Sequence, residues 1–308
     1  MGFRILGTGS ALPARSVTND DLSEFLDTSD EWIFPRTGIA SRRICTTETL
    51  DDLSLEACRR ALDASGVTPG QLDLIICSTT SGDHLIPAQA CAVAEGLGAS
   101  CPAFDVSAAC AGFVFALDVA DGWFARGRAE RVLVVAAEKM SRVVDWQDRA
   151  TCVLFGDGAA AAVLAAGGES PLATSLTTEP AVEILHVPGI AGSSPYDETE
   201  RAASVLSMEG RRVFKFGVNA IVDSVRTLCE EAHVAIDDID HFVFHQANER
   251  ILSSGVARLG IDDAKVARAL SETGNISSAC IPLEAGQLVA LVGFGAGLDV
   301  GAMLLRWG

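Results

Sequence analysis

Apolar runs alternate with amphipathic segments along the whole chain. The runs "FRILGTG" (3–9), "LDLIICSTT" (72–80) and "RVLVVAAE" (131–138) are typical of buried strands. Between the first two lies "SLEACRRALDASG" (54–66), whose apolar residues recur at helical spacing. This alternation predicts an α/β fold in which helices cover the faces of buried strands.

The same pattern occurs twice. In each copy a helix ends, a polar turn follows, and a strand begins; further on, a second helix ends at a glycine and a strand and a small-residue turn follow. The matching segments are 64–80 with 232–248, and 96–98 with 258–260. A repeat of this kind indicates one supersecondary unit used twice. We therefore predict two related halves, residues 1–170 and 171–308.

Three polar or reactive residues occupy matching places in these halves. Cys110 lies in the small-residue turn of the first half, Asn275 lies in that of the second, and His245 follows the strand 242–244. Each has an ordinary structural explanation: a small buried thiol, a turn-forming asparagine and a core histidine. The carboxyl ends of strands are, however, where α/β sheets bind ligands. We expect the three side chains to converge on one site.

Charge and cysteine usage exclude several classes of protein. The 308 residues carry a formal net charge of −18, which argues against nucleic-acid binding because phosphates require clustered Lys and Arg. The nine cysteines form no C-x-x-C pair. They are typical of reduced, buried thiols in a reducing compartment, so we predict neither a metal site nor a disulfide scaffold.

The chain also shows no signal for a membrane or for secretion. No apolar run reaches the roughly 18 residues that a spanning helix needs. The start, "MGFRILGTGSALPARS", has no basic segment followed by an apolar one, as a secretory signal would. We expect a cytoplasmic protein without membrane contact.

Longer strings around these residues resemble the β-ketoacyl-acyl carrier protein synthase III family of the thiolase-like superfamily. They are "TSDEWIFPRTGIASRR" (28–43), "DVSAACAGF" (105–113), "DRAT" with "LFGDGAAAAVL" (148–164), "VFKF" (213–216), "HQANERI" (245–251), "GNISSA" (274–279) and "GFGAGL" (293–298). The resemblance implies a layered αβαβα fold and a homodimer. It implies a decarboxylative Claisen condensation between an acyl-CoA primer, acetyl-CoA or another short chain, and malonyl-acyl carrier protein. This reaction initiates fatty acid synthesis and uses coenzyme A thioester as substrate, with no cofactor or metal.

By this resemblance Cys110, His245 and Asn275 are the catalytic triad. Cys110 would begin a helix, where unpaired N–H groups and the helix dipole favour a thiolate. Backbone N–H groups of Cys110 and of the loop Gly295, Ala296 and Gly297 are suited to form an oxyanion hole. His245 and Asn275 are neutral donors that can stabilise the enolate formed on decarboxylation, which a carboxylate would repel.

The resemblance also implies three groups of substrate-binding residues. Coenzyme A would bind to Trp32 and Arg149, which stack on adenine, and to Arg36, Gly210 and Asn248 along the tunnel. The acyl pocket would be formed by Met140 and Leu206, with Ile86 closing the pocket of the neighbouring subunit. The acidic carrier protein would dock on a basic patch of Lys215, Arg250 and Arg258, with Arg211 and Arg212 beside them.

The chain departs from the family pattern after Asn275. Only "ISSACIPLEAGQ" separates Asn275 from the strand expected at Leu288, whereas the family and the internal repeat lead us to expect roughly ten residues more. A crossover between parallel strands usually takes a dozen or more residues and contains a helix. Either the second crossover helix is truncated, or the sequence lacks a segment. In the first case we expect Asn275 to be poorly braced and condensation to be slow. Smaller departures are Phe34-Pro35 beside Trp32 and Glu249 beside Arg250.

Two other functions fit the same residues. One is a starter-unit synthase or acyltransferase of a polyketide pathway, which keeps the nucleophile and changes the acceptor. The other is a non-catalytic partner subunit that binds acyl carrier protein. The intact Cys110, His245 and Asn275 argue against the second alternative, whereas the short crossover favours it.

Overall fold

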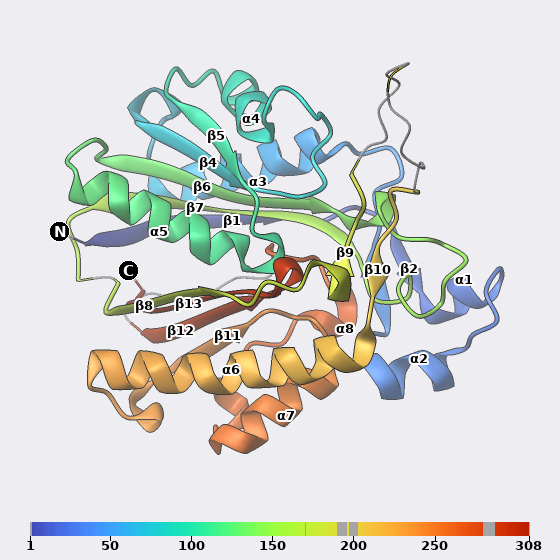
Figure 1. Ribbon diagram of the computed structural model, residues 1–308. Helices are drawn as coiled ribbons and strands as arrows, with labels where there is room; N and C mark the ends of the chain where they lie inside the picture. The colour runs from blue at the N-terminus through green and yellow to red at the C-terminus, as the bar shows by residue number, and fades with distance from the viewer. Residues whose placement is uncertain (1, 170, 190–195, 197–202, 280–286, 308) are drawn as a thin grey trace.

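Two large β-sheets, one helix layer between them and helices on both outer faces form the body of the described molecule (Figure 1). The computed structural model describes residues 2–169, 171–189, 196, 203–279 and 287–307. One outer layer consists of α3 (Leu50–Ser65) and α4 (Gln89–Leu97), and the other of α6 (Gly210–Ala232) and α7 (Glu249–Leu259). Helix α5 (Gly112–Ala125) lies between the sheets. The predicted αβαβα fold is confirmed.

The first sheet takes its strands from the N-terminal part of the chain. Its order is β1-β7-β6-β4-β5, in which β6, β4 and β5 are parallel and β7 is antiparallel to both of its neighbours. The strands are β1 (Phe3–Ala11), β4 (Leu74–Ser78), β5 (Ala103–Val106), β6 (Arg131–Lys139) and β7 (Asp157–Ala166).

The second sheet repeats this order. It runs β8-β13-β12-β11, with β12 and β11 parallel, and Val266 extends it by a parallel bridge to Phe242. The strands are β8 (Ala173–Thr178), β11 (His241–Phe244), β12 (Leu288–Phe294) and β13 (Asp299–Arg306). The repeated segments of the sequence correspond as well, since η1 (Pro69–Gln71) leads into β4 and η5 (Ile236–Asp238) leads into β11. The boundary near residue 170 stays a prediction.

Short elements gather beside the carboxyl ends of the parallel strands (Figure 1). They are β2 (Ser16–Thr18), α1 (Asn19–Ser23), α2 (Asp30–Thr37), β3 (Ser41–Arg43), η2 (Ala109–Ala111), η3 (Met140–Arg142), η4 (Val182–Ile184), β9 (Leu185–His186), β10 (Ser207–Met208), α8 (Leu270–Thr273) and η7 (Ala296–Leu298). Two further sheets of the described chain, β2-β3 and β9-β10, have two strands each. The short helix η6 (Asp263–Lys265) lies at the opposite end, where Lys265 donates to the Asp237 and Ile239 carbonyls before β11. Within the described ranges, no helix combines the length and the hydropathy that crossing a membrane requires.

The core between the sheets is built around α5. Phe113 and Leu117 of this helix belong to the same buried cluster as Val134 of β6 and as Leu291 and Met303 of the second sheet. The alternation of β6 places Val132, Val134 and Ala136 in this central cluster, whereas the residues between them pack under α3. The expected crossover after Asn275 falls on residues 280–286, which lie outside the described residues.

Candidate active site

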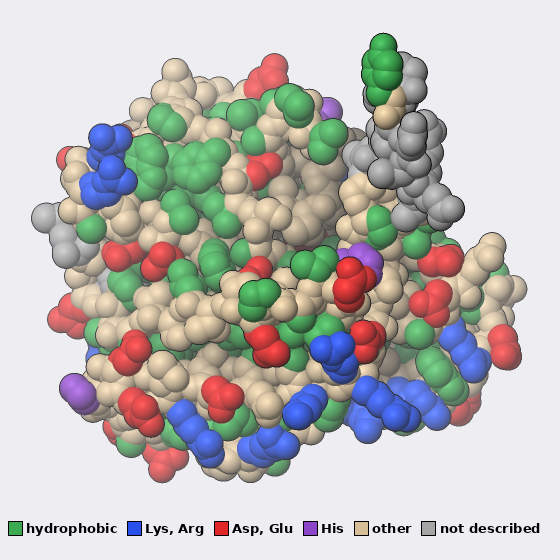
Figure 2. Space-filling model, viewed as in Figure 1, with side chains coloured by type: hydrophobic (Ala, Val, Ile, Leu, Met, Phe, Trp, Pro, Cys, Tyr) green, Lys and Arg blue, Asp and Glu red, His purple; other side chains and the backbone are tan. Residues whose placement is uncertain are grey.

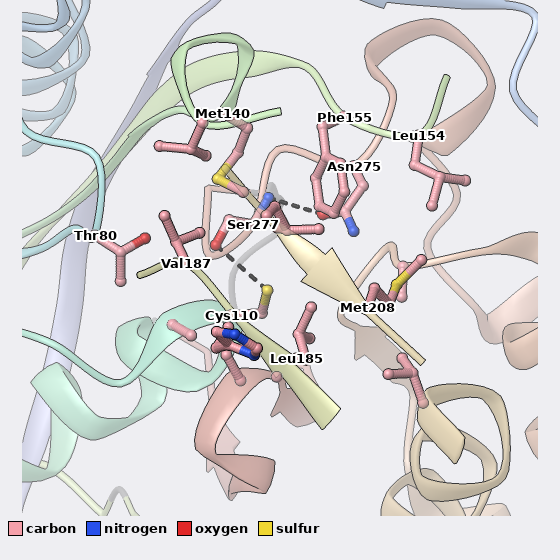
Figure 3. A pocket seen from close by; sticks show the side chains of 18 of the residues that line it. Thr80, Cys110, Met140, Leu154, Phe155, Leu185, Val187, Met208, Asn275 and Ser277 are labelled. Atoms are coloured by element: carbon pink, nitrogen blue, oxygen red, sulfur yellow. Dashed lines mark hydrogen bonds between the residues drawn. The ribbon is translucent and has the colours of Figure 1, made fainter. Parts of the chain in front are cut away.

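A cavity of about 1290 Å³ opens where the carboxyl ends of strands from both sheets meet. Cys110, His245 and Asn275 line its inner part, and Trp32 and Arg36 line another part of its wall. Figure 3 shows Cys110, Asn275 and Ser277 close to one another in this cavity, with Leu185 of β9 and Met208 of β10 also on its wall. The three residues that the sequence analysis expected at one site therefore share one cavity.

Cys110 lies in η2, immediately before α5. The β12–η7 loop packs tightly against it: a Cβ atom placed on Gly295 would lie only 2.9 Å from the backbone N and 3.2 Å from the Sγ of Cys110. Only glycine allows this approach. Gly295 and Ala296 line the cavity, and Gly297 turns the loop with a φ of +83°. The predicted oxyanion loop thus lies directly beside the sulfur.

His245 follows the last residue of β11. Its backbone N–H donates to the Val292 carbonyl at 2.8 Å, and its ring meets the Phe294 ring edge-on with the centroids 5.2 Å apart. Burial lowers the pKa of the imidazole to about 4, an effect that an interaction with the Ser277 backbone partly offsets. The ring is therefore neutral at neutral pH.

Asn275 is held by the other half of the chain. Its N–H donates to the Leu154 carbonyl at 2.8 Å, and its carbonyl accepts from the Gly156 N–H at 3.0 Å. Its side-chain Oδ1 accepts the Ser277 N–H at 2.9 Å, so Nδ2 is the end that can donate to a bound oxygen (Figure 3). The expectation that a short crossover leaves Asn275 poorly braced is wrong, because the bracing comes from residues 154–156.

The residues predicted to bind coenzyme A lie close together. Trp32 of α2 has the guanidinium carbons of both Arg36 and Arg149 at 4.9 Å from its ring centroid. Asn248 caps α7 and donates to the Arg36 carbonyl at 3.1 Å, which joins α7 to α2. Gly210 begins α6 and lines the cavity. Pro35 is accommodated within α2, so the Phe34-Pro35 departure does not break the helix.

The predicted acyl-pocket residues divide into two groups. Met140 and Leu206 are buried and line the cavity, where Leu185 and Val187 accompany them. Ile86 is 86 % exposed on the loop before α4, outside the cavity of its own chain.

The predicted docking residues lie on two adjacent helices. Arg258 of α7 donates to Asn219 Oδ1 of α6 at 3.2 Å, and the guanidinium of Arg250 lies 5.8 Å from the Phe214 ring centroid. Figure 2 shows Lys and Arg side chains gathered at the lower right, over the N-terminal part of α6, where Lys215 lies. Glu249 pairs with Arg268 at 3.2 Å rather than with Arg250.

Cys110 differs from the other described cysteines in lining this cavity. The eight described cysteines form no disulfide with one another. Burial raises the pKa of Cys152 to about 11 and that of Cys45 to about 12, and it raises those of Cys58 and Cys77 as well. Cys280, the ninth, lies outside the described residues.

The sequence analysis missed Ser277, which contacts Cys110, and Glu138, which contacts Ser277. The Ser277 hydroxyl donates to Cys110 Sγ at 3.4 Å (Figure 3), and it also lies 3.3 Å from Oε1 of Glu138. Ser277 has a φ of +53°, which is uncommon outside glycine. The available signal for Glu138 was a carboxylate near the end of the apolar strand "RVLVVAAE".

The family of the chain follows from comparison with known proteins. The family model described as 3-Oxoacyl-[acyl-carrier-protein (ACP)] synthase III matches residues 104–180, and its C-terminal counterpart matches residues 229–307. The chain belongs to this family. A beta-ketoacyl-[acyl-carrier-protein] synthase III of Clostridium acetobutylicum is 43% identical to it, over 98% of each chain. One from Neisseria meningitidis is also 43% identical, over 99% of each chain.

Solved structures give the same result for the fold. The 3-oxoacyl-[acyl-carrier-protein] synthase III of Aquifex aeolicus superposes with a TM-score of 0.92 at 39% identity, covering 99% of this chain and 100% of the other. The priming β-ketosynthase of the R1128 polyketide pathway superposes with a TM-score of 0.91 at 37% identity, covering 99% and 96%. As a member of the family the chain is a condensing acyltransferase, as predicted. The roles of its single residues stay predictions.

Proposed function

We propose that this chain condenses an acyl-CoA primer with malonyl-acyl carrier protein, releasing CO₂ and forming 3-ketoacyl-acyl carrier protein. The observation that carries the proposal is the shared cavity. It brings a cysteine thiol next to a glycine loop and two neutral donors, while Trp32 and Arg36 line the same cavity and Arg149 lies against the Trp32 ring. A thioester bound along the cavity can therefore reach Cys110.

The first half-reaction moves the acyl group to the enzyme. The Cys110 sulfur attacks the thioester carbonyl carbon, the bond from that carbon to the coenzyme A sulfur breaks, and coenzyme A leaves as the free thiol. The Cys110 N–H and the loop of Gly295 and Ala296 are the groups closest to where the oxyanion would form. Donors held in place before the reaction stabilise that charge with no cost of reorganisation.

The second half-reaction forms the carbon–carbon bond. Malonyl-acyl carrier protein loses CO₂, and its thioester oxygen takes up the enolate charge. The neutral His245 ring and the Nδ2 of Asn275 are the donors suited to this oxygen. The enolate carbon then attacks the acyl-Cys110 thioester, and the Cys110 sulfur is released.

The two half-reactions can be tested separately. His245→Ala and Asn275→Ala should leave acylation of Cys110 measurable and lower condensation by about 10²–10³, the usual effect of losing one such donor. Intact-protein mass spectrometry after acetyl-CoA measures the first step, and ¹⁴CO₂ release from labelled malonyl-acyl carrier protein measures the second. An unmodified chain that neither acylates nor releases CO₂ would instead support the non-catalytic partner subunit.

A starter-unit synthase of a polyketide pathway is the second candidate. Its support is the 37% identity to the R1128 priming β-ketosynthase at a TM-score of 0.91. The same nucleophile and donors would serve both functions, so only the primer and the carrier protein distinguish them. Competition between acetyl-CoA and longer or branched acyl-CoA primers, with carrier proteins of each pathway, decides the question.

We also propose that the chain forms a homodimer. Strand β5 is at the edge of the first sheet, and an unpaired edge is a surface on which another chain can pair. Phe104 of β5 and Trp123 of α5 are only partly buried, and Leu85 and Ile86 project nearby on the loop before α4. These residues supply apolar surface for a partner and would place Ile86 at the partner's acyl pocket.

The remaining proposals follow the sequence. Residues 1–170 would carry the nucleophile and residues 171–308 the two donors, which the matching strand orders support. The described cysteines, which form no disulfide with one another, fit a reducing compartment such as the cytoplasm. We propose that coenzyme A enters as a substrate thioester and that no other cofactor takes part, since side chains and backbone N–H groups perform each step above.

A further inference from the structure

Glu138 is a buried carboxylic acid on the strand that leads to the active site. Its place on β6 continues the face of Val132, Val134 and Ala136, so the side chain points into the layer between the two sheets. The residue is 0 % exposed. Its carboxylate accepts hydrogen bonds from the Thr80 N–H and hydroxyl, from the Ser81 hydroxyl and from the Ser277 hydroxyl.

The charged groups around Glu138 are engaged elsewhere. Arg142 of η3 donates to the Ser81 and Gly82 carbonyls and to Asp83, and the Lys139 ammonium donates to the Glu48 carbonyl. Asp157 of β7 accepts from Ser141 and from the Cys45 N–H. Cys77 of β4 interacts electrostatically with Glu138 and carries no positive charge. Cys110 of η2 also carries no positive charge, and burial keeps His245 uncharged at neutral pH.

Since the nearby Arg142 and Lys139 bind other groups, burial decides the protonation of Glu138. It raises the pKa of Glu138 to about 7, against the effect of the four hydrogen bonds. A carboxyl group with such a pKa gains and loses a proton within the range in which enzymes work. The steps described under the proposed function make no use of it.

Ser277 connects this acid to the nucleophile. Its hydroxyl oxygen lies 3.4 Å from Cys110 Sγ and 3.3 Å from Glu138 Oε1. A hydroxyl carries a single proton, so it donates to only one of these partners at a time. The other contact is a hydrogen bond only if its partner brings a proton, either as the Cys110 thiol or as the Glu138 acid. The Ser277 hydroxyl therefore lies where one proton can be shared between Cys110 and Glu138.

We propose that Ser277 and Glu138 form a relay that removes the thiol proton of Cys110 during acylation and returns it to the leaving group. The Cys110 S–H bond breaks and its proton passes to the Ser277 oxygen, while the Ser277 hydroxyl proton passes to Oε1 of Glu138. The thiolate forms the new bond to the acyl carbon and the coenzyme A thiolate leaves. The relay then runs in reverse and protonates that thiolate, so no net proton is gained or lost. This inference rests on the proposed role of Cys110 as the acyl carrier.

The two relay residues differ in role. Ser277 touches the reacting sulfur, whereas Glu138 acts through Ser277 and is a positioning residue that also holds the proton. The hydroxyl is kept in place by the backbone, because the Ser277 N–H donates to Asn275 Oδ1. The turn that presents Asn275 for the second half-reaction thus presents Ser277 for the first.

The test is the pH dependence of Cys110 acetylation by acetyl-CoA, followed by rapid quench and intact-protein mass spectrometry. In the unmodified chain the rate should rise with pH around a midpoint near 7, an apparent value that belongs to the coupled pair. Glu138→Gln and Ser277→Gly should slow acetylation about 10²-fold and remove that midpoint. Glycine suits the positive φ at position 277, so that variant keeps the backbone. Glu138→Asp should restore part of the acetylation rate and a midpoint in its pH dependence.

Asp157→Asn is the matched control, since Asp157 is an equally buried carboxylate on the adjacent strand that accepts hydrogen bonds from Ser141 and from the Cys45 N–H. It should leave the midpoint unchanged. The proposal is overturned if Glu138→Gln or Ser277→Gly keeps the midpoint, or if Asp157→Asn moves it equally. The pH dependence of Cys110 alkylation by iodoacetamide measures the same midpoint without coenzyme A. A chain that is alkylated with the expected midpoint but never acetylated would contradict the proposed function and leave the relay standing.

Discussion

The guanidinium of Arg149 lies against the indole ring of Trp32, 4.9 Å from its centroid. Arg149 also donates to the Asp27 carbonyl, which holds it over the ring. If adenine stacks between Trp32 and Arg149, this contact must open to admit the base. The sequence predicted both residues as adenine neighbours, and the structure adds that they contact each other directly.

Trp32→Ala and Arg149→Ala should each raise the KM for acyl-CoA about ten-fold and leave the KM for malonyl-acyl carrier protein nearly unchanged. The loss of one stacking face costs roughly 1–2 kcal/mol. Steady-state kinetics with each substrate varied in turn measures both values. Equal changes for both substrates would show that these residues do not hold the adenine.

Cys110 should be the cysteine that acyl-CoA and alkylating reagents modify at neutral pH. Burial raises the pKa values of Cys45, Cys58, Cys77 and Cys152, so these thiols stay protonated and unreactive. Peptide mapping by mass spectrometry locates the label. Cys110→Ala should abolish it without changing the thermal midpoint by more than a few degrees, and label at Cys91 or Cys280 would contradict the assignment.

Gly295→Ala should slow acylation of Cys110 by one to two orders of magnitude, because the new Cβ would lie 2.9 Å from the backbone N of Cys110, one of the predicted oxyanion donors. Gly122→Ala, on α5 where an added Cβ meets nothing within 4 Å, is the control and should acylate normally. Rapid-quench acylation compares the two variants. Normal acylation by Gly295→Ala would mean that the loop gives way and provides no donor.

Glu138 should make the chain less stable as pH rises. With a pKa of about 7 when folded and 4.5 when unfolded, the folded chain holds more protons between these values, so its free energy of unfolding falls through that range. The full effect is roughly 3 kcal/mol. The free energy of unfolding of Glu138→Gln should therefore rise relative to that of the unmodified chain as the pH is raised from 5 to 8. Urea unfolding at both pH values measures this difference. A difference in unfolding free energy between the variant and the unmodified chain that is the same at pH 5 and pH 8 would contradict this prediction.

Reversing the charge of Arg250 or Lys215 to Glu should weaken the use of malonyl-acyl carrier protein and flatten its salt dependence, while self-acylation by acetyl-CoA stays normal. Arg126→Glu is the control, because Arg126 is exposed at the end of α5 remote from Cys110. The kcat/KM at several salt concentrations is the measurement. A parallel fall in self-acylation would show that the carrier-protein docking surface lies elsewhere.

The fold and the convergence of three side chains on one cavity could be predicted because they follow from local patterns, whereas the roles of those side chains stay predictions. Buried strands, glycine-capped helices and the repeated order place Cys110, His245 and Asn275 at strand ends. The relay could not be predicted, since Ser277 and Glu138 meet only through the packing of one half on the other. Arg42 is a second residue whose contacts could not be predicted from the local sequence. In "SRR" (41–43) it looks like a surface charge, but its side chain is fully buried and donates to Asn19 Oδ1 and to the Val153 carbonyl.

The pairing of Asn275 with Leu154 and Gly156 has a consequence for how the protein is made. These residues are far apart in the chain, and contacts between distant residues form late because a long loop must close first. On the ribosome, the segment around Phe155 emerges long before its partner Asn275 is translated. Secondary structure should therefore appear early in refolding, and condensing activity should return only with the slowest phase.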